Sequence, residues 1–256
     1  MSEPVLKVTG INKRFGGLQA LSEVAVTIQA GQVYGLIGPN GAGKTTFFNV
    51  ITGLYTSDSG TFELGGAPYK PSAVHEVAKQ GIARTFQNIR LFPEMTALEN
   101  VMVGRHVRTH SGLIGAVFRT ASFKAEEAAI ELRSRELLEY VGISEYADYR
   151  ARTLSYGDQR RLEIARALAT DPKLIALDEP AAGMNATEKR VLRELIDRIR
   201  NDGRTILLIE HDVKLVMGLC DRVTVLDYGK QIAEGTPAEV QKNEQVIEAY
   251  LGTGHH

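Results

Sequence analysis

Residues 38–46 have the composition of a loop that binds phosphate groups. They read Gly-Pro-Asn-Gly-Ala-Gly-Lys-Thr-Thr and fit the pattern G-x-x-x-x-G-K-[ST]. Glycines let such a loop curl, so that successive backbone N–H groups point at phosphate oxygens. We expect Lys44 to reach the β- and γ-phosphates of a nucleotide and the Thr45 hydroxyl to bind Mg²⁺. The residues expected to bind the nucleotide here are Gly38, Asn40, Gly41, Gly43, Lys44, Thr45 and Thr46.

The elements around this loop support that interpretation. Residues 33–37 form an apolar run typical of a buried strand, and a helical pattern follows over about residues 45–53. A helix in that place directs the positive end of its dipole at a bound anion. The alternative is a plain glycine-rich turn, against which the flanking strand and helix argue.

Two adjacent carboxylates follow a second apolar run. Residues 174–177 are Leu-Ile-Ala-Leu, and Asp178 and Glu179 come directly after them. Asp178 at such a strand end can hold Mg²⁺ through its water shell. Glu179 can take a proton from an attacking water as a general base. Alone, this run would usually mean a solvated strand end, but the phosphate loop favours the catalytic interpretation.

The third motif is the start of a helix near residue 155. Ser155 and Gly157 stand just before an amphipathic pattern that runs to about residue 170. The N–H groups at a helix start can bind an anion. The alternative is an ordinary N-cap, with Ser155 as the cap and Asp158 at the third helical position. The local sequence leaves both interpretations open.

The elements that must position these motifs predict an α/β fold. Apolar, β-branched runs alternate with helical patterns, which is typical of a mostly parallel sheet covered by helices. Strands are expected at residues 33–37, 174–177 and 205–209, and their polar ends are where α/β sheets place ligands. Antiparallel pairs are expected at residues 5–9 with 24–28 and at 223–226 with 230–233.

Residues 88–153 differ from the rest of the chain because helical patterns replace strand-like runs. Within them, Ala125, Ala128, Leu132 and Leu138 recur at helical spacing with charges between them, which predicts a helix over residues 124–141. This segment is therefore expected to be a helical insertion in the α/β domain.

Composition narrows the class of protein. The 256 residues are 43% hydrophobic, enough for a large α/β domain with a smaller insertion. Thirty basic residues against 31 acidic ones lack the excess of a nucleic-acid binder, so no nucleic-acid partner is expected. A single cysteine excludes an internal disulfide and fits a reducing compartment. We see no signal peptide and no apolar run near the roughly 18–20 residues of a membrane span, and expect a cytosolic chain unless another subunit holds it at a membrane.

Together the three motifs resemble the ATP-binding cassette family over nearly the whole chain. Residues 38–46 are similar to its phosphate loop, residues 177–180 to its magnesium and base segment, and residues 154–158 to its signature sequence. The resemblance implies ATP and Mg²⁺ as cofactors and a P-loop (RecA-like) core with an antiparallel β subdomain and an inserted helical subdomain. The domains it implies are a nucleotide-binding core over 1–87 and 154–235, a helical subdomain over 88–153 and a C-terminal helical tail over 236–256.

The signature segment departs from the family pattern L-S-G-G-Q at two positions. Tyr156 replaces the first glycine, and Asp158 replaces the glutamine. Ser155 and Gly157, which the family uses on the γ-phosphate, are kept, so the resemblance implies a working site. Asn185 stands where many members have Asp, at a position tied to communication between two ATP sites.

The resemblance also gives expected roles to three single residues. Phe15 is similar to the aromatic residue that stacks on adenine, although an early Phe is more often a core residue. Gln87 matches the glutamine that senses Mg²⁺ and water, and His211 matches the switch histidine that contacts the γ-phosphate. The expected catalytic residues are thus Glu179, His211 and Gln87, and the expected metal ligands are Thr45, Gln87 and Asp178.

Residues 84–92, 156–165, 178–185 and 246–252 are most similar to one subset of the family, the ATPase subunits of bacterial importers of branched-chain amino acids. ATPases of urea and amide importers and of lipopolysaccharide export are the alternatives. This resemblance implies transmembrane permease subunits as partners, only indirect contact with a solute-binding protein, and a peripheral place on the cytoplasmic face of the bacterial inner membrane. It also implies a head-to-tail dimer with a second ATPase subunit, identical or paralogous.

Other classes of protein share parts of this pattern. A soluble cassette protein of DNA repair or translation usually carries a long coiled coil or two cassettes in one chain, and this sequence has neither. A P-loop kinase or GTPase would lack Ser155 and Gly157 and would carry an acceptor site or a base-reading motif. A purely structural nucleotide-binding module would not need both Glu179 and His211.

An apolar cluster follows Gln87 in the sequence. Leu91, Phe92 and Met95 lie around Pro93, where we expect an exposed loop. A core position is the alternative for these residue types. If the cluster is exposed, a docking surface explains it better, and the resemblance implies that a short helix of a membrane subunit docks there.

We predict that Lys44→Ala loses most of the ATP binding of the chain, because Lys44 carries the only fixed positive charge of the phosphate loop. Titration of the purified chain with nucleotide measures the loss. Binding close to that of the unaltered chain would remove Lys44 from the phosphate site.

Overall fold

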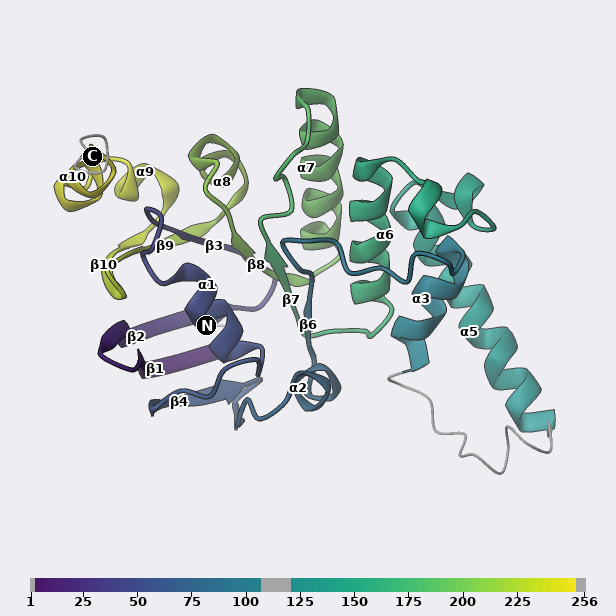
Figure 1. The fold of residues 1–256 in the computed structure, drawn as a ribbon, viewed down its shortest axis with the longest axis horizontal. Helices are drawn as coiled ribbons and strands as arrows, with labels where there is room; N and C mark the ends of the chain where they lie inside the picture. Colours follow the sequence, from purple (N-terminus) through teal and green to yellow (C-terminus); the bar gives the residue numbers. More distant parts are fainter. Residues whose placement is uncertain (1–2, 107–120, 252–256) are drawn as a thin grey trace. The chain divides into compact units, whose positions relative to one another are not determined.

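The computed structural model describes residues 3–106 and 121–251 (Figure 1). Contacts within the chain divide it into unit 1, with Met1–Gln87 and Lys173–His256, and unit 2, with Asn88–Pro172. Residues 107–120 of the expected helical segment and residues 252–256 of the expected C-terminal tail lie outside the described residues.

Unit 1 contains a six-stranded sheet in the order β10-β9-β3-β8-β7-β6. Its strands are β3 (Val33–Ile37), β6 (Ile82–Arg84), β7 (Leu174–Asp178), β8 (Thr205–Ile209), β9 (Arg222–Asp227) and β10 (Lys230–Gly235). All neighbours are parallel except β10, which pairs antiparallel with β9. Every residue of β3, β7 and β8 is buried, as expected for apolar strands covered on both faces. The three predicted parallel strands are confirmed, and their carboxyl ends meet at one edge of the sheet.

A second sheet of unit 1 is antiparallel, in the order β2-β1-β4-β5. Its strands are β1 (Pro4–Phe15), β2 (Leu18–Gln29), β4 (Ser59–Leu64) and β5 (Ala67–Pro68). In β2, Val24, Val26 and Ile28 are buried and alternate with less buried residues, the pattern of a sheet with one covered face. The pairing of β1 with β2 and of β9 with β10 confirms both predicted antiparallel pairs.

The helices in the described part of unit 1 are α1 (Lys44–Ile51), α2 (Val74–Gln80), α7 (Ala186–Asn201), α8 (Val213–Leu219), α9 (Pro237–Val240) and α10 (Glu244–Leu251). Helix α1 packs between the two sheets, where Phe47, Phe48 and Ile51 share an apolar core with residues of both sheets (Figure 1). Helices α7 and α8 cover the opposite face of the six-stranded sheet (Figure 1). The strand ends that carry the motifs are therefore held between two covered faces.

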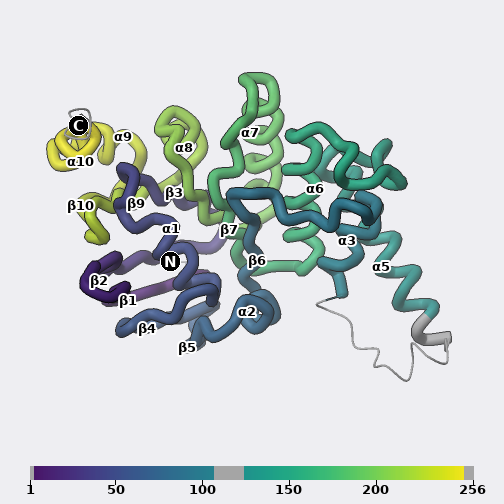
Figure 2. Tube along the Cα trace, in the orientation of Figure 1, coloured from purple at the N-terminus to yellow at the C-terminus, as the bar shows by residue number. Residues whose placement is uncertain are grey.

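Unit 2 is helical in its described part. Its elements are α3 (Ala97–Arg105), α5 (Ala121–Tyr140), α6 (Tyr156–Leu168) and two short 3₁₀ helices, η2 (Ser144–Tyr146) and η3 (Ala151–Thr153). A capping box between Thr96 and Glu99 begins α3. Helix α6 packs against α3 and α5 (Figure 2). Because of this packing, α6 belongs to unit 2, which extends to Pro172. The expected domain boundary at residue 153 therefore falls inside unit 2.

The helices expected at residues 45–53, 124–141 and 155–170 are present as α1, α5 and α6, with slightly different ends. The end of α1 is set by Thr52, whose hydroxyl donates to the carbonyl oxygen of Phe48 at 2.7 Å and closes the last turn. Each described helix is too short or too polar to cross a lipid bilayer.

We predict that Gly38→Ala lowers the free energy of unfolding by roughly 3–4 kcal/mol, the combined cost of overpacking and of an unfavourable backbone. Gly38 has a φ of 152°, and a Cβ there would lie 2.1 Å from the backbone carbonyl oxygen of Leu226, which cannot turn away. Gly41→Ala is the matched control, because Gly41 also has a positive φ, of 80°, but a Cβ there meets nothing within 4 Å. Urea unfolding of both variants measures the difference, and equal losses would contradict the prediction.

Candidate functional site

The curled part of the phosphate loop, residues 38–43, joins β3 to α1 and is held by hydrogen bonds to other segments. The N–H of Ala42 donates to the carbonyl oxygen of Pro39 at 3.2 Å and closes the loop. In the turn between β9 and β10, Gly229 donates its N–H to the carbonyl oxygen of Ala42 at 2.9 Å. The carbonyl oxygen of Gly229 accepts the N–H of Ser22 on β2 at 2.8 Å. One residue of the turn thus ties the phosphate loop to the antiparallel sheet.

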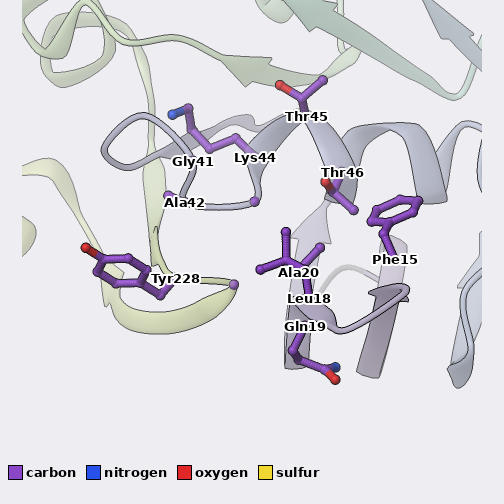
Figure 3. Close-up of a pocket in the computed structure, with 12 residues that line it drawn as sticks. Phe15, Leu18, Gln19, Ala20, Gly41, Ala42, Lys44, Thr45, Thr46 and Tyr228 are labelled. Carbon is purple, nitrogen blue, oxygen red and sulfur yellow. The ribbon is translucent and has the colours of Figure 1, made fainter.

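The Lys44 side chain turns back into the curl of the loop (Figure 3). Its Nζ donates to the carbonyl oxygens of Gly38 at 2.7 Å and Pro39 at 2.9 Å. Burial lowers the pKa of the Lys44 ammonium, and the negative charge of Glu179 opposes that shift. The loop therefore holds a buried cation whose hydrogen bonds can be exchanged for stronger ones to phosphate oxygens.

A pocket of about 280 Å³ opens beside the start of α1. Figure 3 shows Phe15 and Thr46 on one side of it and Tyr228 on the other. Of the residues expected to bind the nucleotide, the pocket is lined by Phe15, Gly41, Gly43, Lys44, Thr45 and Thr46. Gly38 and Asn40 belong to the loop but do not line the pocket. Most of the expected nucleotide contacts in unit 1 thus converge on one hollow.

Phe15, at the end of β1, presents its ring to solvent. The residue is 41% exposed, so the alternative that it belongs to the core is wrong. Its ring meets Tyr55 edge-on, with centroids 5.3 Å apart, and the Lys13 ammonium lies 5.3 Å from the ring centroid. These two contacts fix the orientation of an exposed aromatic face beside the phosphate loop.

A cluster of polar side chains lies at the carboxyl ends of β7 and β8. Asp178, the last residue of β7, is buried, and its N–H donates to the Thr85 hydroxyl at 3.3 Å. One oxygen of Glu179 accepts a hydrogen bond from Nε2 of Gln87 at 2.8 Å. The other lies 3.4 Å from Nδ1 of His211. The structure therefore brings together the three residues expected to be catalytic, with both oxygens of the Glu179 carboxylate facing a polar group.

The backbone of Glu179 is unusual for a residue with a side chain. Its φ is 46°, in the left-handed region, which costs of order 1–3 kcal/mol and persists only where surrounding contacts impose it. One such contact is the hydrogen bond from the N–H of Glu179 to the carbonyl oxygen of Ile209 at 2.9 Å. The end of the neighbouring strand β8 thus helps to hold the backbone of Glu179 in this conformation.

Ser155 and Gly157 lie in unit 2, at the start of α6. The Ser155 hydroxyl accepts the N–H of Asp158 at 3.2 Å and donates to the Asp158 carboxylate at 2.6 Å, so Ser155 is the N-cap of α6, one of the two interpretations that the sequence left open. Arg161 forms an ion pair with the same carboxylate. Tyr156 is 42% exposed, and its hydroxyl accepts a hydrogen bond from Arg160 at 3.1 Å. The start of α6 is therefore capped by side-chain hydrogen bonds, and Tyr156 in its first turn is exposed.

Two further residues of unit 1, one beside the pocket and one beside His211, were not identified from the sequence. Tyr228 is 82% exposed, has a φ of 43° and lines the pocket. The expected antiparallel pair of residues 223–226 and 230–233 implies a turn at this Tyr-Gly pair, but not the contact of the turn with the phosphate loop. Glu210 directly precedes His211 and is fully buried. A charge at the end of an apolar run was its only sign, and such residues are usually solvated.

Comparison with known proteins places these features in a family. The family model described as ABC transporter matches residues 21–182, and a model described as branched-chain amino acid ATP-binding cassette transporter matches residues 230–256. The high-affinity branched-chain amino acid transport ATP-binding protein LivG of Salmonella typhimurium is 46% identical over 98% of this chain and 99% of that protein. The lipopolysaccharide export system ATP-binding protein LptB of Haemophilus influenzae is 35% identical over 97% of each.

Solved structures agree with the sequence comparisons. A crystal structure of an ATP-binding cassette of an ABC transporter, in its ADP conformation, has a TM-score of 0.85 to this chain at 33% identity, covering 98% of this chain and 100% of that one. A nucleotide-free ATP-binding cassette from an ABC transporter has a TM-score of 0.82 at the same identity, with 96% and 98% covered. With a family match over most of its length and relatives aligned nearly from end to end, the chain belongs to the ABC transporter family, as one of its ATP-binding subunits.

Proposed function

We propose that this chain hydrolyses ATP to drive the uptake of branched-chain amino acids. One observation carries the proposal: the Glu179 carboxylate contacts both Gln87 and His211 in the unit that holds the phosphate loop. A module that only bound nucleotide would not need a carboxylate held between those two groups. The solute is inferred from the family match at residues 230–256 and from the 46% identity to LivG.

ATP binds with its adenine on the exposed face of Phe15 and its phosphates in the loop of residues 38–46. The backbone N–H groups of the loop and the positive end of α1 attract the phosphate oxygens. Lys44 exchanges its bonds to the Gly38 and Pro39 carbonyl oxygens for bonds to the β- and γ-phosphates. The pocket between Phe15 and the loop supplies room for this arrangement.

The side chains of Thr45, Asp178 and Gln87 fit Mg²⁺ as the cofactor. All three offer oxygen atoms, which this cation prefers, and nucleotide sites hold it through one or two carboxylates together with phosphates. Asp178 is the buried carboxylate that ends β7, and Thr45 lies in the first turn of α1. When bound there, Mg²⁺ neutralises charge on the phosphates during transfer.

Glu179 acts as the general base in hydrolysis. Its carboxylate takes the proton of the attacking water while the water oxygen bonds to the γ-phosphorus. The bond from that phosphorus to the bridging oxygen breaks, leaving ADP and phosphate. The hydrogen bond from Gln87 and the facing His211 hold both carboxylate oxygens in place. A base of this kind contributes about 10²–10⁴ in rate.

The complete site forms between two chains. Each ATP lies between the phosphate loop of one chain and Ser155 and Gly157 of the other, in a head-to-tail dimer whose second member is identical or paralogous. The start of α6 offers N–H groups and the Ser155 hydroxyl to the γ-phosphate. Loss of the γ-phosphate removes these contacts, so the dimer opens and moves the membrane subunits.

The permease subunits dock on the segment that follows Gln87, which places the chain peripherally on the cytoplasmic face of the bacterial inner membrane. Phe92 is 45% exposed and Met95 is 38% exposed, as the sequence predicts, whereas Leu91 of the same cluster is half-buried. Asn100 clamps the backbone of Phe92, accepting its N–H at 2.8 Å and donating to its carbonyl oxygen at 3.0 Å. An exposed ring on a fixed backbone suits a docking surface.

We predict that Glu179→Gln abolishes turnover while ATP affinity is kept, because the amide cannot accept the proton but preserves the shape of the site. The loss should be about 10²–10⁴-fold. Phosphate release and nucleotide titration measure the two effects. Near-normal hydrolysis would remove Glu179 from the role of base.

The same variant tests the composite site. Glu179→Gln should accumulate as an ATP-bound dimer in size-exclusion chromatography, because the γ-phosphate contacts persist. Adding Ser155→Arg to it should leave ATP binding to a single chain intact and return the protein to a monomer. A double variant that still dimerises with ATP would reject the composite site.

We predict that Phe92→Asp weakens assembly with the permease subunits and lowers transport, with the fold and ATP binding of the isolated chain unchanged. Leu132→Asp is the matched control, because Leu132 is an apolar residue of unit 2 that is 62% exposed on α5. Thermal melts, nucleotide titration and pull-down on one preparation make the comparison. A much earlier melt would make Phe92 a core residue, and full assembly of a stable variant would place the docking surface elsewhere.

A further inference from the structure

Glu210 is a buried carboxylate beside the proposed catalytic residues. It follows β8 and precedes His211, and its exposed fraction is 0%. Removing a carboxylate from water is costly unless strong contacts compensate for it. An apolar side chain would fill this place at lower cost, so the carboxyl needs an explanation beyond packing.

One oxygen of Glu210 holds the turn that follows Glu179. Oε1 of Glu210 accepts the backbone N–H of Ala181 at 2.8 Å. The carbonyl oxygen of Ile209, one residue earlier, accepts the N–H of Glu179 at 2.9 Å. The end of β8 and the residue after it therefore hold this turn by two hydrogen bonds. One is made by the backbone of Ile209 and the other by the buried side chain of Glu210.

The turn needs such a grip because it begins with a residue in an unfavourable conformation. Glu179 has a φ of 46°, and the turn closes with a hydrogen bond from the N–H of Ala182 to the carbonyl oxygen of Glu179 at 3.1 Å. Without an external hold, the turn would relax toward a favoured backbone and redirect the carboxylate. Its contacts with Gln87 and His211 would then be lost.

We infer that Glu210 is a positioning residue for Glu179, acting through its hydrogen bond to the N–H of Ala181. The inference rests on the proposed role of Glu179 as the base. The adjacent residues Glu210 and His211 then have different roles toward Glu179. Glu210 holds the backbone of the turn that follows Glu179, and His211 faces the Glu179 carboxylate.

Glu210→Gln and Glu210→Met in the full chain test this inference. Glutamine keeps an oxygen that can accept the N–H of Ala181, whereas methionine is similar in size but offers no such acceptor. We expect Glu210→Met to lower kcat by about 10- to 100-fold, the cost of a misplaced catalytic group. The KM and the Kd for ATP with Mg²⁺ should change little. Glu210→Gln should recover most of the lost kcat.

A destabilising control separates positioning from general loss of stability. Ile199→Ala removes a fully buried side chain on α7, away from the turn, and should lower the melting temperature with kcat unchanged.

Burial raises the pKa of Glu210, so its contribution to stability falls as pH rises through that value. Glu210→Gln lacks this titration and should lose less stability than the unaltered chain as pH rises above the ordinary pKa of a glutamate carboxyl, which urea unfolding at a series of pH values measures.

Several outcomes would overturn the inference. Full kcat in both Glu210 variants would do so. A fall in the kcat of Glu210→Met that is no larger than the fall in its folded fraction would do so too. If Glu210→Met does not fold, Glu210→Ser takes its place, and failure of both to fold would make the carboxyl a requirement of the fold alone. Glu179→Gln is assayed beside them. Normal hydrolysis by that variant rejects the proposed function, whereas an inactive Glu179→Gln with a fully active Glu210→Met rejects only the role of Glu210.

Discussion

The candidate site depends on the parallel pairing of β3, β8 and β7. In the observed register Leu36 pairs with Ile209, and Ile209 pairs with Asp178. Each strand is mostly apolar and leads into functional residues at its carboxyl end: the phosphate loop follows β3, Asp178 ends β7 with Glu179 directly after it, and His211 follows Glu210 after β8. A slip of one residue would turn the side chains to the opposite face and separate these groups. Hydrophobic burial of the strands thus determines the geometry of polar residues that lie beyond them.

Much of this arrangement could be predicted because its causes are local. The phosphate loop needs glycines and a lysine at fixed spacing, and the strands at residues 33–37, 174–177 and 205–209 are short apolar runs between helical patterns. The side-chain caps are also local, since Ser155 and Asp158 are three residues apart. The strand ends and the loop therefore followed from the sequence, and the cap was one of the two interpretations that the sequence offered for Ser155.

The remainder depends on contacts between distant segments. Gly229, which is far from the phosphate loop in the sequence, donates a hydrogen bond to it, and the edge-on contact of Tyr55 with Phe15 joins the loop after α1 to the end of β1. The amphipathic pattern of α6 predicts that one face is buried, but not which helices cover it. The expected boundary at residue 153 therefore separated α6 from α3 and α5, against which it packs. The burial of Glu210 was hidden for the same reason.

The hydrogen bonds of Lys44 have a consequence for how tightly the chain holds its nucleotide. Each hydrogen bond to a charged group is worth about 1.5–3 kcal/mol, and the ammonium gives up two to backbone carbonyl oxygens when a phosphate replaces them. The affinity for ATP therefore reflects the difference in free energy between two states in which the Lys44 ammonium is hydrogen-bonded, first to the loop and then to the phosphates. In return, the internal bonds keep the loop in shape before the nucleotide arrives, so association does not incur the entropy of ordering it.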